Sequence, residues 1–170
     1  MRKLKLPIMA AAILGLTGST ISEAGQQQPT FKTVTVTIHR VAATDNLDGD
    51  FIKKDEADFY ARVWIGGFSH RTETMSKDDA RPNWRISESV TANVVPIKIC
   101  MMDDDGGLEE KDDHVDINPQ EGEKCLNLWY NTTTGQISGD LAGPSTRMFA
   151  TRGGGKDSDK ARIWFSISHQ

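Results

Sequence analysis

Hydrophobic and polar residues alternate along several short segments of the chain. In the first of these, from Phe31 to Val41, Val34, Val36 and Ile38 alternate with threonines, which is the period of a strand with one buried face. The same alternation predicts seven further strands, over residues 57–65, 68–74, 83–91, 95–102, 114–117, 124–130 and 161–168. The chain is therefore predicted to be rich in short strands separated by turns.

Turn-forming clusters of Gly, Asn, Asp and Pro separate these segments, and after residue 24 no segment keeps an apolar 3.6-residue stripe for three turns. Eight short strands without a helix are typical of a β-sandwich or a β-barrel. Residues 131–160 contain no convincing strand. A connection of that length is uncommon in a compact domain, so we expect it to be functional or disordered.

The N-terminus has the features of an export signal. Three basic residues, Arg2, Lys3 and Lys5, precede an apolar run over residues 6–16, and small residues stand at Ser22 and Ala24. This order predicts a signal peptide over residues 1–24, cleaved near Ala24, and an exported product that is extracellular or periplasmic. We expect a linker over residues 25–30 and one domain over residues 31–170.

Overall charge restricts the class of partner. The 170 residues have a formal net charge of -4, and loss of the predicted signal peptide would remove three basic residues and one acidic residue. Nucleic-acid binding depends on cationic contacts, so this acidic balance argues against a nucleic-acid partner. We expect a monomer.

Two cysteines and four tryptophans stand in predicted strands. Cys100 and Cys125 fall in different strands, and in an exported chain they form either a disulfide or two buried thiols. We expect the tryptophans to pack in the core rather than to form a sugar-stacking platform. They are Trp64, Trp84, Trp129 and Trp164.

Aspartates cluster in two of the predicted connections. One loop carries Asp103, Asp104 and Asp105 at one end and Asp112 and Asp113 at the other. Closing this loop brings like charges together, at a cost in free energy unless a cation lies between them. Calcium takes six to eight oxygen ligands in irregular geometry, whereas zinc prefers nitrogen and sulfur and magnesium requires a strict octahedron. The sequence therefore predicts calcium.

The connection after the first strand is also rich in oxygen ligands. Asn46, Asp48, Gly49 and Asp55 match part of the helix-loop-helix calcium signature, but Thr44 stands where that signature begins with Asp. No helices are predicted on either side. We therefore retain the ligands and reject the helical motif in favour of a β-sandwich that binds cations in its loops.

Five segments resemble motifs of the C2 domain family, in the family's order, over roughly residues 32–130. They are the strand opening at residues 57–63, with Phe59 where the family has Pro; the basic strand at residues 70–74; the turn at residues 81–84, similar to Asn-Pro-x-Trp; the Asp-x-Asp strand end at residues 99–105; and the Asp and short strand at residues 113–117, with Asp116 where Gly is common.

This resemblance implies an eight-stranded antiparallel Greek-key β-sandwich that binds calcium. Carried over by position, the implied ligands are Asp58, Asp103, Asp105 and Asp113, joined by Asp48 or Asp50 or both. A last strand at residues 161–168 further implies the circularly permuted topology of phospholipase C type. In that topology Asp157 and Asp159 would reach the calcium end, as ligands or as a cover.

The function expected from the resemblance is calcium-dependent binding of an anionic lipid surface or a protein partner. Phe51 and Ile52, followed by two lysines, suit insertion into an anionic membrane surface. Alternatively, Phe51 and Ile52 pack under the loop, and the lysines offset the negative charge of the aspartates. The alternative is a secreted hydrolase or a carbohydrate-binding accessory module with structural calcium. Histidines stand singly and Gly-x-Ser-x-Gly is absent, so we expect no catalytic residues; His114 beside Asp113 is the one candidate base.

Overall fold

The structure is a computed structural model that describes residues 30–44, 56–104, 112–156 and 159–170. The predicted signal peptide, the predicted linker up to residue 29, and the predicted ligands Asp48, Asp50 and Asp105 lie outside the described residues. Within those ranges the secondary structure consists of strands and turns, with no helix. Accordingly, the described part of the chain has no helix that is long and apolar enough to cross a membrane.

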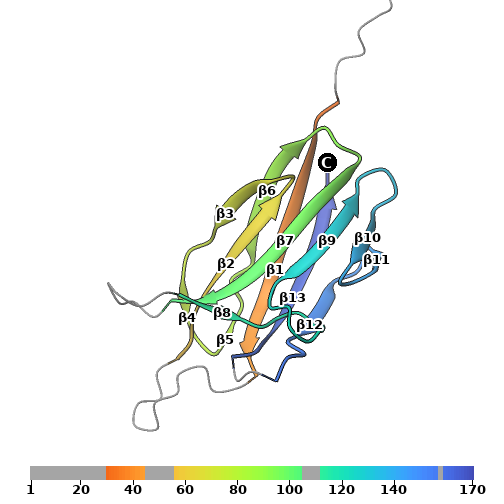
Figure 1. Ribbon diagram of the computed structural model, residues 1–170. Helices are drawn as coiled ribbons and strands as arrows, with labels where there is room; N and C mark the ends of the chain where they lie inside the picture. Colours follow the sequence, from red (N-terminus) through yellow and green to blue (C-terminus); the bar gives the residue numbers. More distant parts are fainter. Residues whose placement is uncertain (1–29, 45–55, 105–111, 157–158) are drawn as a thin grey trace, which may run out of the picture.

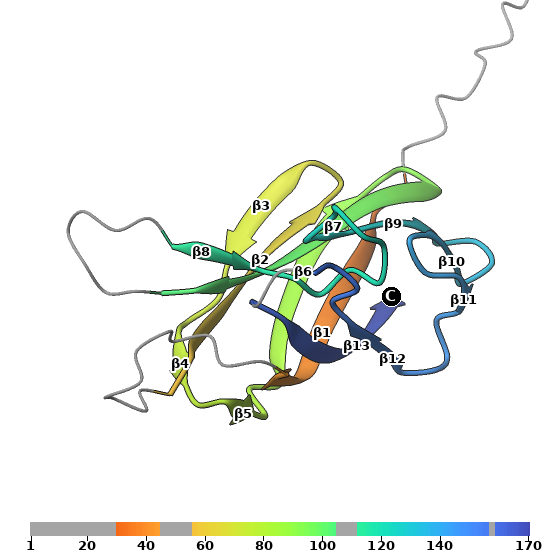
Figure 2. The same ribbon diagram turned by 60° about the horizontal axis from the view of Figure 1, so that its bottom comes forward.

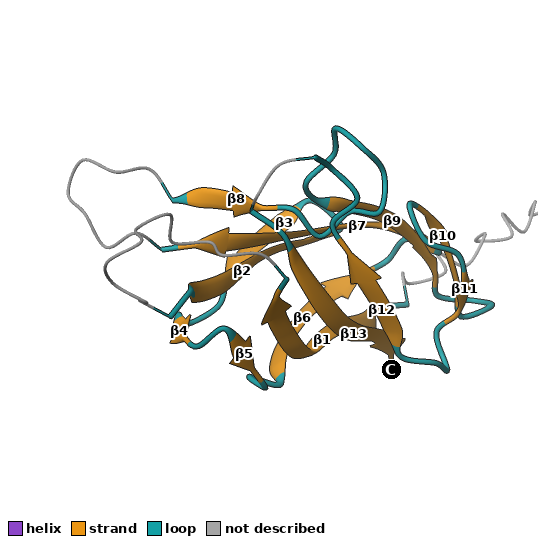
Figure 3. Ribbon diagram, turned by 90° about the horizontal axis from the view of Figure 1, so that it is seen from below, coloured by secondary structure: helices purple, strands orange, loops and turns teal. Residues whose placement is uncertain are grey.

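The strands form two antiparallel sheets that pack face to face as a β-sandwich (Figure 3). In the first sheet β1 is central, with β13 and then β12 on one side and β6 and β5 on the other. Its strands are β1 (Lys32–Ala43), β5 (Asp79–Ala80), β6 (Trp84–Val90), β12 (Phe149–Arg152) and β13 (Ala161–His169).

The second sheet has the order β11-β10-β9-β7-β2-β3, with β4 added to β2 and β8 added to β7. Its strands are β2 (Asp58–Ile65), β3 (Phe68–Arg71), β4 (Met75–Ser76), β7 (Val94–Asp103), β8 (Asp113–Val115), β9 (Leu126–Asn131), β10 (Gln136–Gly139) and β11 (Gly143–Pro144). The all-β class predicted from the alternation and the β-sandwich implied by the resemblance are both confirmed.

The core lies between the two sheets and follows the period of two. Along β2, the side chains of Phe59, Val63 and Ile65 are fully buried, whereas Arg62 and Trp64 point to the opposite face. Along β1, Val34, Val36 and Ile38 are likewise fully buried, and they face the second sheet. Burial of these alternate apolar side chains is the main favourable term that holds the layers together.

The expectation of a strandless stretch over residues 131–160 is wrong. This stretch contains β10, β11 and β12, and a turn with Gly135 in the left-handed region (φ 69°) connects β9 to β10. These strands are two to four residues long and lie at or near the sheet edges. They bury at most one or two side chains each, such as Ile137 in β10, so the sequence shows too few alternations to reveal them.

Several strand ends meet at one end of the sandwich, which we call the acidic pole: the end of β1, the start of β2, the end of β7 and the start of β8 (Figures 1 and 2). Asp78 links two of them, because its carbonyl oxygen accepts a hydrogen bond from Ala43 N (2.7 Å) and its Oδ1 accepts one from Ala57 N (3.1 Å). The sheets therefore bring together chain segments that are far apart in the sequence.

The last connection also runs beside the end of β1. Thr44 N donates a hydrogen bond to the carbonyl oxygen of Lys160 (2.8 Å), and Asp116 N donates one to the carbonyl oxygen of Asp159 (2.7 Å). The first described strand, β1, pairs with the last, β13. The permuted topology of phospholipase C type nevertheless stays a prediction.

Candidate metal centre

Asp58 and Asp103 lie on adjacent strand ends at the acidic pole. Asp58 is the first residue of β2 and Asp103 the last residue of β7, and the register of these strands places Phe59 opposite Asp103. Asp58 N donates a hydrogen bond to Asp103 Oδ1 (2.8 Å), and Asp104 N donates one to the carbonyl oxygen of Asp58 (3.0 Å). The antiparallel ladder therefore fixes both backbones at the same place.

One oxygen of this pair has no hydrogen-bond partner in the described part of the chain. Asp58 Oδ1 is buried and has no hydrogen-bond partner among the described residues, and Asp103 itself is only 6% exposed. A buried polar group without a partner costs on the order of 1–3 kcal/mol, and more if it is charged. A cation bound at Asp58 Oδ1 would relieve this cost, and an all-oxygen donor set suits a hard cation such as calcium.

Asp113 lies across from Asp103 in the pairing of β7 with β8, and its side chain is exposed. The structure thus places three predicted ligands at one pole, namely Asp58, Asp103 and Asp113. Their carboxylate oxygens do not form a closed cluster: in the described ranges, the one set of three ligand atoms all within 4.8 Å of one another belongs to Cys100, His114 and Cys125. Asp48, Asp50 and Asp105 lie outside the described residues.

Asp104 differs from its neighbour Asp103. Its Oδ2 accepts hydrogen bonds from Arg71 Nη2 (2.9 Å) and Thr74 Oγ1 (3.0 Å). The same guanidinium lies over the ring of Tyr60, with 3.9 Å from its carbon to the ring centroid. Arg71 of β3 and the nearby Thr74 therefore compensate the charge of Asp104. Asp104 is thus a suitable control position for substitutions that remove the charge of Asp103.

Asp112 is held on the outer face of the second sheet by a hydrogen bond from the Tyr60 hydroxyl. Burial of the phenol, and then the carboxylate of Asp112, raise the pKa of Tyr60. The raised pKa keeps the Tyr60 phenol neutral, so the phenol remains the donor of this hydrogen bond. The Asp112 carboxylate therefore points toward Tyr60. Asp104 and Asp112 therefore both have protein partners on this outer face.

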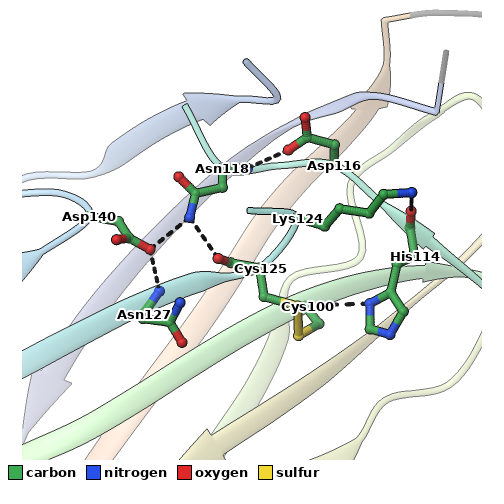
Figure 4. Close-up of a disulfide and its surroundings, with 8 residues drawn as sticks. All are labelled: Cys100, His114, Asp116, Asn118, Lys124, Cys125, Asn127 and Asp140. Carbon is green, nitrogen blue, oxygen red and sulfur yellow. Dashed lines mark hydrogen bonds between the residues drawn. A yellow bond between two sulfur atoms is a disulfide. The ribbon is translucent and has the colours of Figure 1, made fainter. Parts of the chain in front are cut away.

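A disulfide joins Cys100 of β7 to Cys125, beside the acidic pole (Figure 4). It decides between the two alternatives left by the sequence, because both cysteines of the chain take part in it. His114 Nδ1 lies 3.8 Å from Cys125 Sγ, and burial, followed by the nearby Lys124, lowers the pKa of His114. Since both sulfurs are bonded to each other, this set does not offer thiolates to a metal.

The sequence did not single out the buried polar network behind the disulfide. Asp116 accepts hydrogen bonds from Asn118 N and Gly155 N (both 2.9 Å), and Asn118 Nδ2 donates to Cys125 O and to Asp140 Oδ2 (both 2.7 Å; Figure 4). Asp116 is 2% exposed. Its occurrence where C2 domains commonly have Gly was the available signal, and its role here is to tie the last connection to the segment after β8.

The prediction that the tryptophans pack in the core is wrong for Trp129, which is 51% exposed. Trp84 is buried, and Trp64 and Trp164 are half-buried. The reason lies in the period of two. Trp129 stands between Leu128 and Tyr130, which are both buried, so its side chain points outward from β9. The alternation of inward and outward positions along β9 therefore predicts the exposure of Trp129, whereas its hydrophobic residue type does not.

Several solved protein structures are similar in fold to this chain. The chain resembles a C2 domain of plant extended synaptotagmin 1 (TM-score 0.51, 10% identity, covering 81% of this chain and 93% of that one). It also resembles a calcium-bound pair of C2 domains from extended synaptotagmin 2 (TM-score 0.51, 11% identity, covering 81% and 45%) and human GIVD cytosolic phospholipase A2 (TM-score 0.50, 16% identity, covering 82% and 16%).

The chain thus spans about 16% of the length of the phospholipase. No family model and no curated protein sequence matches the chain. At 10–16% identity, the structural likeness shows a shared fold. The molecule therefore has a C2-like β-sandwich fold.

Proposed function

We propose that the protein is an exported calcium-binding module that attaches to an anionic lipid surface when calcium occupies the acidic pole. The observation that carries this proposal is the pair Asp58 and Asp103, adjacent strand-end carboxylates of which Asp58 Oδ1 is buried without a partner among the described residues. One solved structure with this fold is itself described as calcium bound.

The proposed ligands are Asp58, Asp103 and Asp113, together with Asp48, Asp50 and Asp105 from the segments outside the described residues. Calcium neutralises several carboxylates at once, so it removes the repulsion between the pole and an anionic surface. Its remaining coordination positions can accept phosphate oxygens of a lipid head group. Phe51, Ile52 and the two lysines that follow also lie outside the described residues, and we propose that they contact the membrane.

The test is cosedimentation with vesicles of phosphatidylserine and phosphatidylcholine, with millimolar calcium or with a chelator. We expect calcium-dependent binding that is lost in Asp58→Asn with Asp103→Asn. Asp104→Asn is the control, because it removes one negative charge of the same loop from a carboxylate that Arg71 and Thr74 already hold. Vesicle binding that is unchanged by the chelator and by the double substitution would contradict the proposal. Calcium binding without vesicle binding would favour a protein partner.

Export is proposed from the basic and apolar N-terminus and is supported by the Cys100–Cys125 disulfide, because disulfides persist in oxidising compartments. Intact mass and N-terminal sequencing of the protein released by expressing cells test this step. We expect a product that begins at Gly25. A product that stays inside the cell and retains Met1–Ala24 would contradict it.

A further inference from the structure

The outer face of the second sheet has a hollow of about 410 Å³ that the calcium-binding proposal does not use. It lies over β2, β7 and β9, whose strands run side by side in the middle of that sheet (Figure 1). We call it the tryptophan hollow; its lining includes Trp64, Gly67, Pro96, Lys98, Asn127 and Trp129.

Sheet register sets the two indoles in neighbouring rows. Trp64 pairs with Lys98, which in turn pairs with Asn127, so these three side chains form one row. Pro96 pairs with Trp129, which pairs with Ser138 of β10, and they form the next row. Trp64 on β2 and Trp129 on β9 therefore stand on opposite sides of β7, with a proline ring and a lysine between them.

The chemistry of this face is mixed. Trp129 is 51% exposed, which leaves a large apolar ring in water at a cost that packing in the core would avoid. Lys98 Nζ lies 5.5 Å from the centroid of the Trp64 ring, within the range of a cation–π contact. Open apolar hollows with a few polar groups are typical of ligand sites.

We propose that the tryptophan hollow binds a saccharide, specifically one that carries a carboxylate, such as a uronic-acid oligosaccharide. A pyranose ring has an apolar face of C–H groups and a rim of hydroxyls. Its face matches an exposed indole, and its rim matches the amide of Asn127 and the ammonium of Lys98, which both line the hollow. Lys98 is the one charged side chain that lines the hollow among the described residues, so it selects an acidic sugar.

The position of the hollow favours a sugar over a bilayer. Trp129 lies opposite Pro96, in the half of β7 that begins at Val94, whereas the acidic pole is at the other end of the same strand, at Asp103. The indoles stand on a sheet face, and Trp64 packs partly against the cluster of Tyr60 and the disulfide. Two indoles with Lys98 and Pro96 between them suit a ligand one or two sugar rings long.

The experiment is a titration with tetragalacturonate, followed by calorimetry and tryptophan fluorescence, with cellotetraose as the neutral comparison. A chelator is present throughout, so failure of the calcium site does not affect the result. We expect tetragalacturonate to bind at least tenfold more tightly than cellotetraose. Trp129→Ala and Trp64→Ala should each weaken binding at least tenfold, and Lys98→Gln should remove the preference for the acidic sugar.

Trp164→Ala is the matched control, because Trp164 is a half-buried tryptophan on β13 of the other sheet. It should leave the affinity unchanged. Circular dichroism identifies any variant that fails to fold, and Trp129→Tyr, which keeps an aromatic ring, should then retain most of the binding. Absence of binding, equal affinity for the two sugars, or loss of vesicle binding rather than sugar binding in Trp129→Ala would each overturn the proposal.

Discussion

Arg40 and Asp79 form a two-pronged ion pair at the surface. Arg40 Nε and Nη2 donate hydrogen bonds of 2.7 and 2.6 Å to the two carboxylate oxygens of Asp79, and the guanidinium lies 4.3 Å from the centroid of the Trp164 ring. This geometry is specific to arginine. The hydrogen bond from Arg40 lowers the pKa of Asp79 and outweighs the opposing effect of burial.

We predict that the Asp79 carboxyl titrates below the ordinary aspartate value in the folded protein. A lowered folded-state pKa stabilises the fold at pH values above the unfolded pKa of about 3.9, and that contribution is lost as the pH falls through the folded-state value. Carboxyl ¹³C NMR of the wild type and of Arg40→Gln measures the shift. A midpoint for Asp79 that is the same in both proteins would show that Arg40 does not cause it.

Gly153 and Gly154 are constrained by close contacts. A Cβ on Gly153 would lie 2.4 Å from the carbonyl oxygen of Asp116, and one on Gly154 would lie 2.2 Å from that of Pro119. Both neighbours are backbone atoms, which move less easily than the end of a side chain. The glycine run therefore lets the last connection pack against the segment after β8.

We predict that Gly153→Ala lowers the free energy of unfolding by roughly 1–3 kcal/mol, the usual range for overpacking. Urea unfolding measures the loss. Asp116→Asn should also destabilise the fold, because Asp116 Oδ2 accepts the hydrogen bond from Gly155 N. If Gly153→Ala unfolds at the wild-type urea concentration, the close approach of these segments is wrong.

At the scale of the element, the disulfide joins β7 to the segment just before β9. The Cα atoms of Cys100 and Cys125 are 4.5 Å apart, and the cysteines are separated by 25 positions. Closing a loop of this length restricts the unfolded chain. The bond therefore stabilises the pairing of the two strands that bear Lys98 and Trp129.

We expect Cys100→Ser with Cys125→Ser to lower the free energy of unfolding by about 3.5 kcal/mol, the entropy of closing such a loop. Reduction of the wild type by a dithiol should produce a similar loss, which separates the bond itself from the packing of the serines. Equal stability of the reduced and oxidised proteins in denaturant titrations would contradict this expectation.

The long strands were predictable from the sequence because each repeats its alternation several times, as in Val34, Val36 and Ile38 of β1. The short strand β10 was not, since Ile137 is its one buried side chain. Aspartates at strand ends were visible in the sequence, and the ladder shows Asp58 next to Asp103. The hydrogen bonds of Asp116 to the last connection were not predictable, because they join segments that lie far apart in the sequence.

At the scale of the whole molecule, the two proposed functions lie in two different places. The acidic pole lies at strand ends, where Asp58, Asp103 and Asp113 stand on neighbouring strands. The tryptophan hollow lies on a sheet face, where register alone aligns the side chains. β7 contributes Asp103 to the first and Lys98 to the second, but the two places have no residue in common. Substitutions in one place should therefore leave the other unchanged.

The most direct test of the central claim is a calorimetric titration of the protein with calcium, combined with thermal unfolding. We predict a heat of binding, together with stabilisation of about 2.7 kcal/mol when calcium is at about one hundred times its dissociation constant. Asp58→Asn with Asp103→Asn should abolish both effects, and Asp104→Asn should retain them. No heat and no stabilisation of the wild type at millimolar calcium would contradict the assignment of the acidic pole as a calcium site.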